Sequence, residues 1–298
     1  MQKRSEGKFT GTKAANLYYQ NWEMDDAVAT LVSSGTAAPA EEHDGDIELP
    51  PLVLGQGEQR LIQAKGLAKY KINLTAWDLR GHGKSDGKRG YVDDFMDYVD
   101  DLGLFFKYLD SQKKLNLPYF MGGHSLGGLI TLRYLLENGS GKAKAICISS
   151  PLLGFSLEIP AIKDYASHIL HRFLPKLTMH NEIDFNVLSH DKDIVKSYSS
   201  DPFRHDKISS GVYLGMVDSI KAVSERGGNA ISAPFLMQLA GDDQIVSRPA
   251  SEVFFKTVYS PQKELIVYEG AYHEIFNETT REKVYEDLSN FILKWSAK

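Results

Sequence analysis

One short stretch of the sequence could supply a nucleophile. The apolar run 119–121 leads into Gly-His-Ser-Leu-Gly at 123–127, and a helix-forming segment follows. A Gly-x-Ser-x-Gly turn between a strand and a helix strains the serine and points its hydroxyl out of the sheet. The sequence therefore predicts that Ser125 is a nucleophile and that the N–H of Leu126 is an oxyanion donor. The alternative is a glycine-rich turn that only allows tight packing.

A serine hydroxyl needs a base and an orienting acid, which in this kind of site follow in the order Ser, Asp, His. The apolar run 235–240 ends in Gly-Asp-Asp, and His273 lies 30 residues beyond Asp243. We expect Asp243 to accept the Nδ1–H of His273, and His273 to take the proton of Ser125. Asp242 is the alternative acid, and its other role would be to hold the turn.

The elements that must position these residues are short apolar runs that alternate with helical patterns, as in a parallel sheet flanked by helices. The expected fold class is therefore α/β, with a mostly parallel central sheet. The expected strands are 27–32, 72–77, 119–121, 144–149, 235–240 and 263–268. The expected helices include 95–109, 126–136 and 278–295.

Residues 151–233 interrupt the alternation and contain no convincing strand. We interpret this segment as an inserted helical cap, and residues 1–150 and 234–298 as the core. Within the cap, 159–177 carries apolar residues at helical spacing. They could touch a membrane surface, line a tunnel or form the core of the cap itself.

Composition excludes several function classes. The chain has 298 residues and a formal net charge of −5, with a pI near 6.0, so no basic field exists to hold nucleic acid. No signal peptide is evident, and no stretch reaches the ~20 apolar residues of a membrane span. We expect a cytoplasmic protein that could be peripheral to a membrane. The single cysteine, Cys147, is interpreted as a small buried hydrophobe.

The sequence resembles the monoacylglycerol lipase and lysophospholipase group of α/β hydrolases. The resemblance runs from about Tyr18 to the C-terminus and implies the α/β-hydrolase fold with a helical cap over an acyl-binding tunnel. It also implies hydrolysis of a single-chain lipid ester without a cofactor. The matching motifs are WDLRGHGKSDG at 77–87, RGYV at 89–92, GHSLGG at 123–128, SSP at 149–151, AGDDQIV at 240–246 and GAYHE at 270–274.

The chain departs from this group at the second oxyanion donor. Relatives carry a His-Gly pair after the first core strand, and the amide just beyond it is the donor. One count places that loop at 33–35, and another places it at 54–58, where Gly55 and Gln56 would supply the donors. The second location is preferred. The two counts imply an insertion at 36–51, which could be a flap, an irregular loop or a sign of a damaged oxyanion hole.

Other polar residues are interpreted as structural. His82 lies in a turn, and His124 should face away from the nucleophile. A run of five aspartates between 93 and 101 is typical of a solvated helix face and its first turn. The five histidines of the expected cap lack the spacing of metal ligands, so no metal site is expected. The acidic run comprises Asp93, Asp94, Asp97, Asp100 and Asp101, and the histidines are His168, His171, His180, His190 and His205.

Three functions follow from these patterns. The first is a serine carboxylester hydrolase that cleaves monoacylglycerols or lysophospholipids through an acyl-enzyme. The second keeps the same three residues but acts on small soluble esters or on N-terminal peptide bonds. The third is a non-catalytic binding protein with an impaired oxyanion hole.

Overall fold

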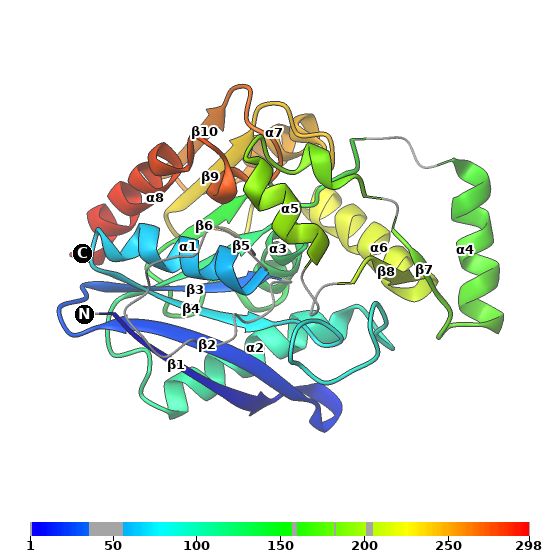
Figure 1. The fold of residues 1–298 in the computed structure, drawn as a ribbon, viewed down its shortest axis with the longest axis horizontal. Coiled ribbons are helices and arrows are strands. Elements are labelled where there is room, and N and C mark those ends of the chain that lie inside the picture. Colours follow the sequence, from blue (N-terminus) through cyan, green and yellow to red (C-terminus); the bar gives the residue numbers. More distant parts are fainter. Residues whose placement is uncertain (1, 36–55, 157–159, 182, 201–204, 298) are drawn as a thin grey trace.

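The centre of the molecule is an eight-stranded sheet (Figure 1). The computed structural model describes residues 2–35, 56–156, 160–181, 183–200 and 205–297. The strand order is β1-β2-β4-β3-β5-β6-β9-β10. From β4 to β10 neighbouring strands are parallel, whereas β1 and β2 add an antiparallel edge. The strands are β1 (Gln2–Thr10), β2 (Asn16–Met24), β3 (Ala29–Gly35), β4 (Ile72–Asp78), β5 (Tyr119–His124), β6 (Ile146–Ser149), β9 (Phe235–Ala240) and β10 (Lys263–Tyr268).

The expected mixed α/β architecture is confirmed, and all six expected strands are present. Strands β9 and β10 match their expected bounds, whereas β3 extends to Gly35. The hairpin β1–β2 was not expected. It covers the sheet edge beside β4 with antiparallel pairing.

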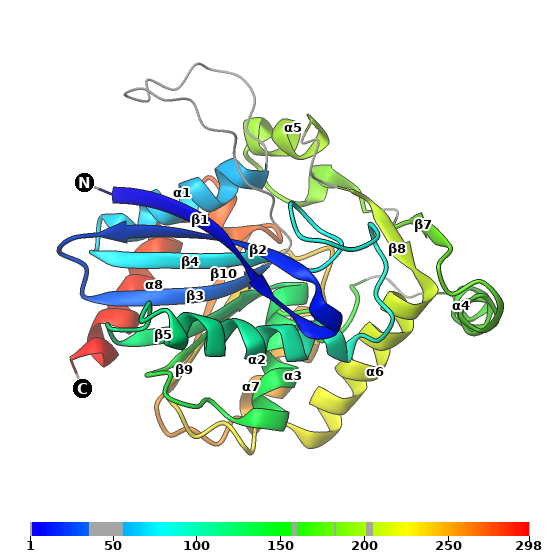
Figure 2. The ribbon, with the colours of Figure 1, turned by 90° about the horizontal axis from the view of Figure 1, so that it is seen from below.

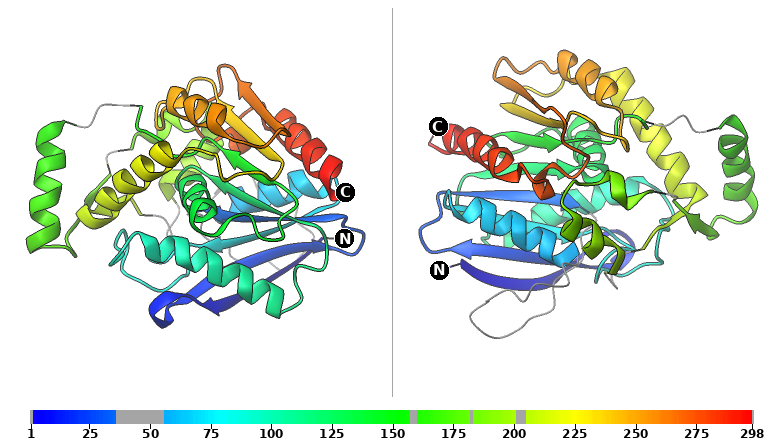
Figure 3. Two further views of the ribbon diagram at one scale, coloured as in Figure 1. Left: turned by 180° about the vertical axis from the view of Figure 1, so that it is seen from behind. Right: turned by 45° about the horizontal axis from the view of Figure 1, so that its top comes forward.

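Helices cover both faces of the sheet (Figures 2 and 3). On one face, α1 (Gln56–Ala68) and α8 (Arg281–Ser296) bury Leu67, Leu288 and Phe291 against the strands. On the other face, α2 (Met96–Ser111), α3 (Leu126–Asn138) and α7 (Arg248–Thr257) contribute to a larger core. Two separate apolar layers therefore hold the sheet rigidly between them.

The acidic run is not a solvated face throughout. Asp97 and Asp101 on α2 are buried, because both face Arg80. The Nε of Arg80 lies 2.8 Å from an oxygen of Asp101, whose other oxygen accepts the N–H of Thr12. The interpretation of these two residues as solvated was wrong, since their partners lie far away in the sequence.

The segment between β6 and β9 lies beyond the carboxyl ends of the parallel strands (Figures 1 and 2). It contains α4 (Ala161–Phe173), β7 (Thr178–His180), η2 (Phe185–Val187), α5 (Lys192–Ser200), β8 (Lys207–Ser209) and α6 (Ser210–Arg226). Of these elements, β7, β8 and α4 lie farthest out. The expectation of no strand was wrong, because β7 and β8 pair antiparallel. Each has only three residues, too few for a period in the sequence. Helix α4 lies at the outer edge of the molecule (Figure 1).

This segment contacts the loop that follows β4. The carbonyl of Gly90 accepts the N–H of Ser209 at 2.7 Å, and the carbonyl of Gly81 accepts the Nε2–H of His205 at 2.9 Å. Gly90 has a φ of +67°, and a Cβ there would collide with the carbonyl of Lys207. The division into a core of residues 1–150 and 234–298 and a cap of 151–233 stays a prediction.

None of the helices in the described ranges is long and apolar enough to cross a membrane. The predicted insertion at 36–51 lies outside the described residues.

Candidate active site

Ser125 occupies a strained turn between β5 and α3. Its φ of 53° and ψ of −121° are unusual for a residue with a side chain. Three backbone hydrogen bonds hold the turn: Ser125 donates its N–H to the carbonyl of Ser149, and its own carbonyl accepts from Leu129 and Leu152, each at 3.1 Å. The serine is therefore fixed at the carboxyl edge of the sheet, as the Gly-x-Ser-x-Gly pattern predicts.

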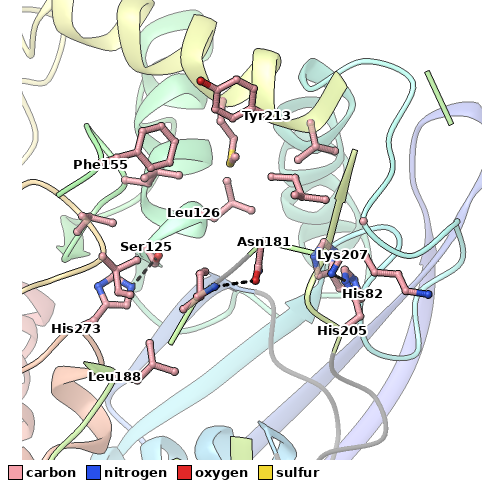
Figure 4. Close-up of a pocket in the computed structure, with 18 of the residues that line it drawn as sticks. His82, Ser125, Leu126, Phe155, Asn181, Leu188, His205, Lys207, Tyr213 and His273 are labelled. Atoms are coloured by element: carbon pink, nitrogen blue, oxygen red, sulfur yellow. Dashed lines mark hydrogen bonds between the residues drawn. The ribbon is translucent and has the colours of Figure 1, made fainter. Parts of the chain in front are cut away.

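The structure brings Ser125, His273 and Asp243 into one hydrogen-bonded chain. Figure 4 shows the contact between Ser125 and His273. The Nδ1 of His273 lies 2.8 Å from Oδ2 of Asp243, and its Nε2 lies 2.9 Å from Oγ of Ser125. Because an ionised carboxylate can only accept, Nδ1 carries the proton. Nε2 is then free to accept the hydroxyl proton of Ser125, which is the arrangement a general base requires.

Asp243 is held as a carboxylate. Burial favours its neutral form, but the hydrogen bond from His273 and the amides of Ile245 and Val246 outweigh burial, so the pKa of Asp243 lies below its ordinary value. The neighbouring Asp242 is exposed, and its N–H donates to the carbonyl of Ala271. Of the two candidate acids, the structure places Asp243 against the histidine.

The expected oxyanion donors are only partly described. Leu126 is the first residue of α3, where the N–H has no acceptor within the helix. Residues 33–35, the other counted location, are the end of β3 and not a loop, since they pair with β4 as far as Asp78. The residues that follow them lie outside the described part of the chain. Gly55 lies outside the described residues, and Gln56 begins α1. The donors Leu126, Gly55 and Gln56 therefore stay a prediction.

A buried ion pair fixes the start of α1 near this edge. The Nη1 of Arg60 lies 2.8 Å from Oδ1 of Asp78, the last residue of β4, and Nη2 donates to the carbonyl of Trp77. Burial raises the pKa of Asp78 to about 6, although Arg60 and the N–H of Lys84 oppose the effect. The first turn of α1, with Gln56, is thereby tied to the carboxyl end of β4.

Ser125 and His273 open into a pocket of about 1170 Å³. That volume exceeds the usual range for small-ligand sites. Figure 4 shows Phe155, Leu126 and Tyr213 around the space beside Ser125. Further apolar wall residues are Leu152, Leu170, Ile183, Leu188, Val212, Met216, Ile245 and Val246. The pocket can therefore accept a long apolar chain whose reacting group rests at Ser125.

Comparison with known proteins agrees with this geometry. Residues 40–280 match the model of a family described as serine aminopeptidase, S33. The human monoglyceride lipase is 33% identical over 222 residues, which cover 72% of this chain and 70% of that protein. The chain belongs to this family of α/β hydrolases.

Two further relatives of this hydrolase carry the names of a lipase and a phospholipase. A monoacylglycerol lipase of Mycolicibacterium smegmatis is 27% identical over 293 residues, 97% of each chain. A Bacillus subtilis protein named phospholipase YtpA is 29% identical over 233 residues, 75% of this chain and 89% of that protein. The hydrolase is thus a lipase- or esterase-like serine hydrolase of the carboxylester hydrolase family.

Solved structures show the same fold. The monoacylglycerol lipase of Paleococcus ferrophilus superposes with a TM-score of 0.76 at 26% identity, covering 94% of this chain and 99% of that one. A soluble variant of the Saccharomyces cerevisiae monoglyceride lipase gives a TM-score of 0.81 at 21% identity, covering 100% of this chain and 96% of that one. The α/β-hydrolase fold is therefore confirmed.

The hydrolase holds a second histidine beside His273. The ring centroids of His124 and His273 lie 4.8 Å apart, so the expectation that His124 faces away from the site was wrong. The Nε2 of His124 lies 3.4 Å from Oε1 of Glu274, and its Nδ1 lies 2.9 Å from Oγ of Ser149. Strand alternation alone misplaced His124, because the segment that follows β10 folds back over the end of β5 and brings His273 and Glu274 against it.

In the described part of the chain, His124, His273 and Glu274 are residue types that can bind a metal ion, and their potential ligand atoms lie within 4.8 Å of one another. Each is already engaged: His273 binds Ser125 and Asp243, and the other two face each other. We therefore treat the cluster as a set of paired charges.

Some residues of the site were not singled out from the sequence. Glu274 is only the last residue of the motif GAYHE at 270–274, and no role was assigned to it from the sequence. His82 was expected to be structural, yet it lines the pocket with its ring centroid 4.6 Å from that of His205. Burial, the largest effect, and the neighbouring His205 lower the pKa of His82 to about 3, so this imidazole is neutral.

Gly123→Ala should lower the free energy of unfolding by about 1–3 kcal/mol, measured by urea denaturation. The added Cβ would lie 2.5 Å from the carbonyl oxygen of Gly127 and 2.7 Å from Oγ1 of Thr131, and so would push α3 away behind Ser125. Gly103→Ala is the control, because its Cβ would meet the movable ring of Tyr134 at 3.1 Å. Equal stability of wild type and Gly123→Ala would contradict this packing.

Proposed function

We propose that this hydrolase cleaves the ester bond of single-chain lipids, either monoacylglycerols or lysophospholipids. The observation that carries the proposal is the hydrogen-bonded chain of Ser125, His273 and Asp243 at the wall of a large, mostly apolar pocket. The lipases and the phospholipase among its relatives support the same substrate class.

In the first half of the reaction, Oγ of Ser125 attacks the ester carbonyl carbon while its proton passes to Nε2 of His273. The carbonyl oxygen becomes an oxyanion, and we propose that the N–H of Leu126, together with the amides of Gly55 and Gln56, stabilises it. Asp243 stays ionised and stabilises the imidazolium. When the intermediate collapses, the C–O bond to the alcohol breaks, and the alcohol leaves with the proton of His273.

In the second half, water attacks the acyl-serine and gives its proton to Nε2 of His273. Collapse of the second tetrahedral intermediate breaks the bond to Oγ, which recovers a proton from His273, and the fatty acid leaves. These steps require no metal or cofactor.

The charges in the pocket favour esters over peptides with a free N-terminus, which the family description would also allow. An ammonium group needs an available carboxylate. The two described carboxylates of the pocket wall that lie next to the proposed base are paired with imidazoles, Asp243 with His273 and Glu274 with His124. The third, Asp184, is an exposed residue before η2 that accepts only from the neutral amides of Asn186. A soluble-ester hydrolase and a non-catalytic binding protein are separated from the proposal by the experiments below.

We also propose that the cap touches lipid surfaces through α4. Ile162, Tyr165 and Phe173 are 77%, 69% and 71% exposed, although they are among the most apolar residues of the cap. The helix lies at the outer edge of the molecule (Figure 1), where these side chains could enter the headgroup region of a bilayer. The pocket wall uses other residues of the same helix, Lys163, Ala166, Ser167 and Leu170.

A long-chain fluorophosphonate should add once to the protein, at Ser125, and Ser125→Ala should abolish the adduct. Asp243→Asn should slow labelling by about 10³–10⁴, because His273 loses the acceptor that fixes its tautomer. Intact mass against time measures both. Asp242→Asn is the matched control and should label at the wild-type rate. Absence of an adduct on folded wild-type protein would favour the binding-protein alternative.

The kcat/KM for esters of one alcohol should rise with acyl length up to eight carbons or more. Each buried methylene contributes about 0.8 kcal/mol, which is up to about fourfold in kcat/KM. A series of 4-nitrophenyl esters below their critical micelle concentrations measures the slope. A maximum at two to four carbons would point instead to small soluble esters.

Phe173→Glu and Ile162→Glu should each weaken binding to phosphatidylcholine–phosphatidylglycerol vesicles by tenfold or more in co-sedimentation. Each change replaces an apolar side chain, worth about 1.5–3 kcal/mol when buried, with a charge. Val253→Glu on α7 is the control, since Val253 is also exposed but lies outside the cap. Equal binding by all three variants and wild type would contradict the contact.

A further inference from the structure

His124 and Glu274 lie directly beside the proposed base without taking part in its hydrogen bonds. His124 ends β5, and its ring faces that of His273 at 4.8 Å. Glu274 follows His273 in the chain, and a carboxylate oxygen of Glu274 lies 3.4 Å from Nε2 of His124. The potential ligand atoms of all three residues fall within 4.8 Å of one another. The two residues are therefore close enough to change the charge on His273.

The environment fixes Glu274 as a carboxylate. Burial alone would raise its pKa, but the attraction to His124, together with hydrogen bonding to His124 and Tyr198, lowers it well below the ordinary value. Its Oε2 also accepts from Nδ2 of Asn277 at 3.1 Å. Glu274 is thus a second fixed anion next to His273.

The same environment favours the protonated form of His124. Burial acts against the charge, but Glu274 outweighs it and raises the pKa of this imidazole above its ordinary value. With Nε2 protonated and facing Glu274, Nδ1 remains beside Oγ of Ser149 at 2.9 Å. The pair therefore places an imidazole whose protonated form is favoured 3.4 Å from a partly buried carboxylate.

We propose that His124 is a positioning residue whose positive charge cancels the Glu274 carboxylate, so that His273 responds to one carboxylate, that of Asp243, instead of two. The inference rests on the proposed function, because it assigns His273 the role of base. A second uncompensated anion would favour the protonated form of His273, which cannot accept the proton of Ser125. His124 thereby keeps the base available in mildly acidic solution.

The other groups around His273 leave this role to His124. Asp243, after β9, faces Nδ1, and Ser125, after β5, faces Nε2. Tyr198, from α5, contacts Glu274, and neither of these two side chains can carry a positive charge. Among the described groups named here, His124 is the cation that can offset Glu274. The contact of Tyr198 with Glu274 also ties α5 of the cap to this cluster.

The protonation state of His124 can be measured by NMR, without an assay of enzyme activity. In protein labelled with ¹⁵N-histidine, one imidazole should have both ring nitrogens protonated at pH 7.5, and His124→Asn should remove that signal. In Glu274→Gln the His124 signal should be that of a neutral ring. A neutral His124 in wild type at pH 7.5 would overturn the proposal, whether or not Ser125 proves to be the nucleophile.

The consequence for catalysis is measured from the pH dependence of kcat/KM. In His124→Asn, Glu274 keeps its hydrogen bonds from Asn277 and Tyr198, and the acid limb should move to higher pH by about one unit or more. Because Asn can still reach Ser149, the local hydrogen bond is retained. In the double variant His124→Asn, Glu274→Gln, the limb should return to the wild-type position.

His168→Asn is the matched control, because His168 pairs with Asp164 at 3.9 Å on the exposed side of α4. The acid limb of the pH profile of this variant should stay at the wild-type position. A loss of activity that is equal at every pH in His124→Asn, or a limb that the second substitution fails to restore, would show a merely structural role and overturn the proposal. Loss of Ser125 labelling in wild type would instead refute the proposed function, while the NMR result would still stand.

Discussion

A single imidazole, that of His273, holds together residues from three distant parts of the chain. Ser125 lies 148 residues before it and Asp243 lies 30 residues before it, yet both contact its ring nitrogens at 2.9 and 2.8 Å. This is possible because the parallel strands β5 and β9 end at the same edge of the sheet, and the turn after β10 returns to that edge. The two apolar layers beneath and above the sheet keep these ends in register.

Such a site concentrates charge where little water can screen it. Two carboxylates, Asp243 and Glu274, and two imidazoles, His124 and His273, share one small volume. In a medium of low polarity each anion changes the protonation of every neighbour, so the charges must balance as a set. The proposed role of His124 follows from this requirement, and the alternative for the cluster, a metal site, would have to displace hydrogen bonds that already exist.

The segment between β6 and β9, which we propose is a cap, also contacts the same cluster. Val212 and Met216 of α6 line the pocket, while Tyr198 of α5 contacts Glu274 and the carbonyl of Leu188 accepts the N–H of Glu274. The outer helix α4 has a different character, because its most apolar side chains face solvent. This segment therefore presents one apolar surface to the pocket, around the proposed acyl chain, and another to solvent, where we propose that it meets lipid.

The sequence by itself determined the residues that are close to one another along the chain or follow a short period. The Gly-x-Ser-x-Gly turn predicted the place of Ser125, apolar runs predicted β9 and β10 to the residue, and the order of motifs predicted Asp243 and His273. Only the tertiary structure decided which charges are paired. Asp97 and Asp101 are buried because Arg80 reaches them, and His124 faces His273 because the chain folds back after β10. Residues 33–35 stay in β3 because β4 pairs with all three and β5 pairs with the first two. Those contacts join residues far apart in sequence, and neither local propensity nor hydrophobic period contains information about them.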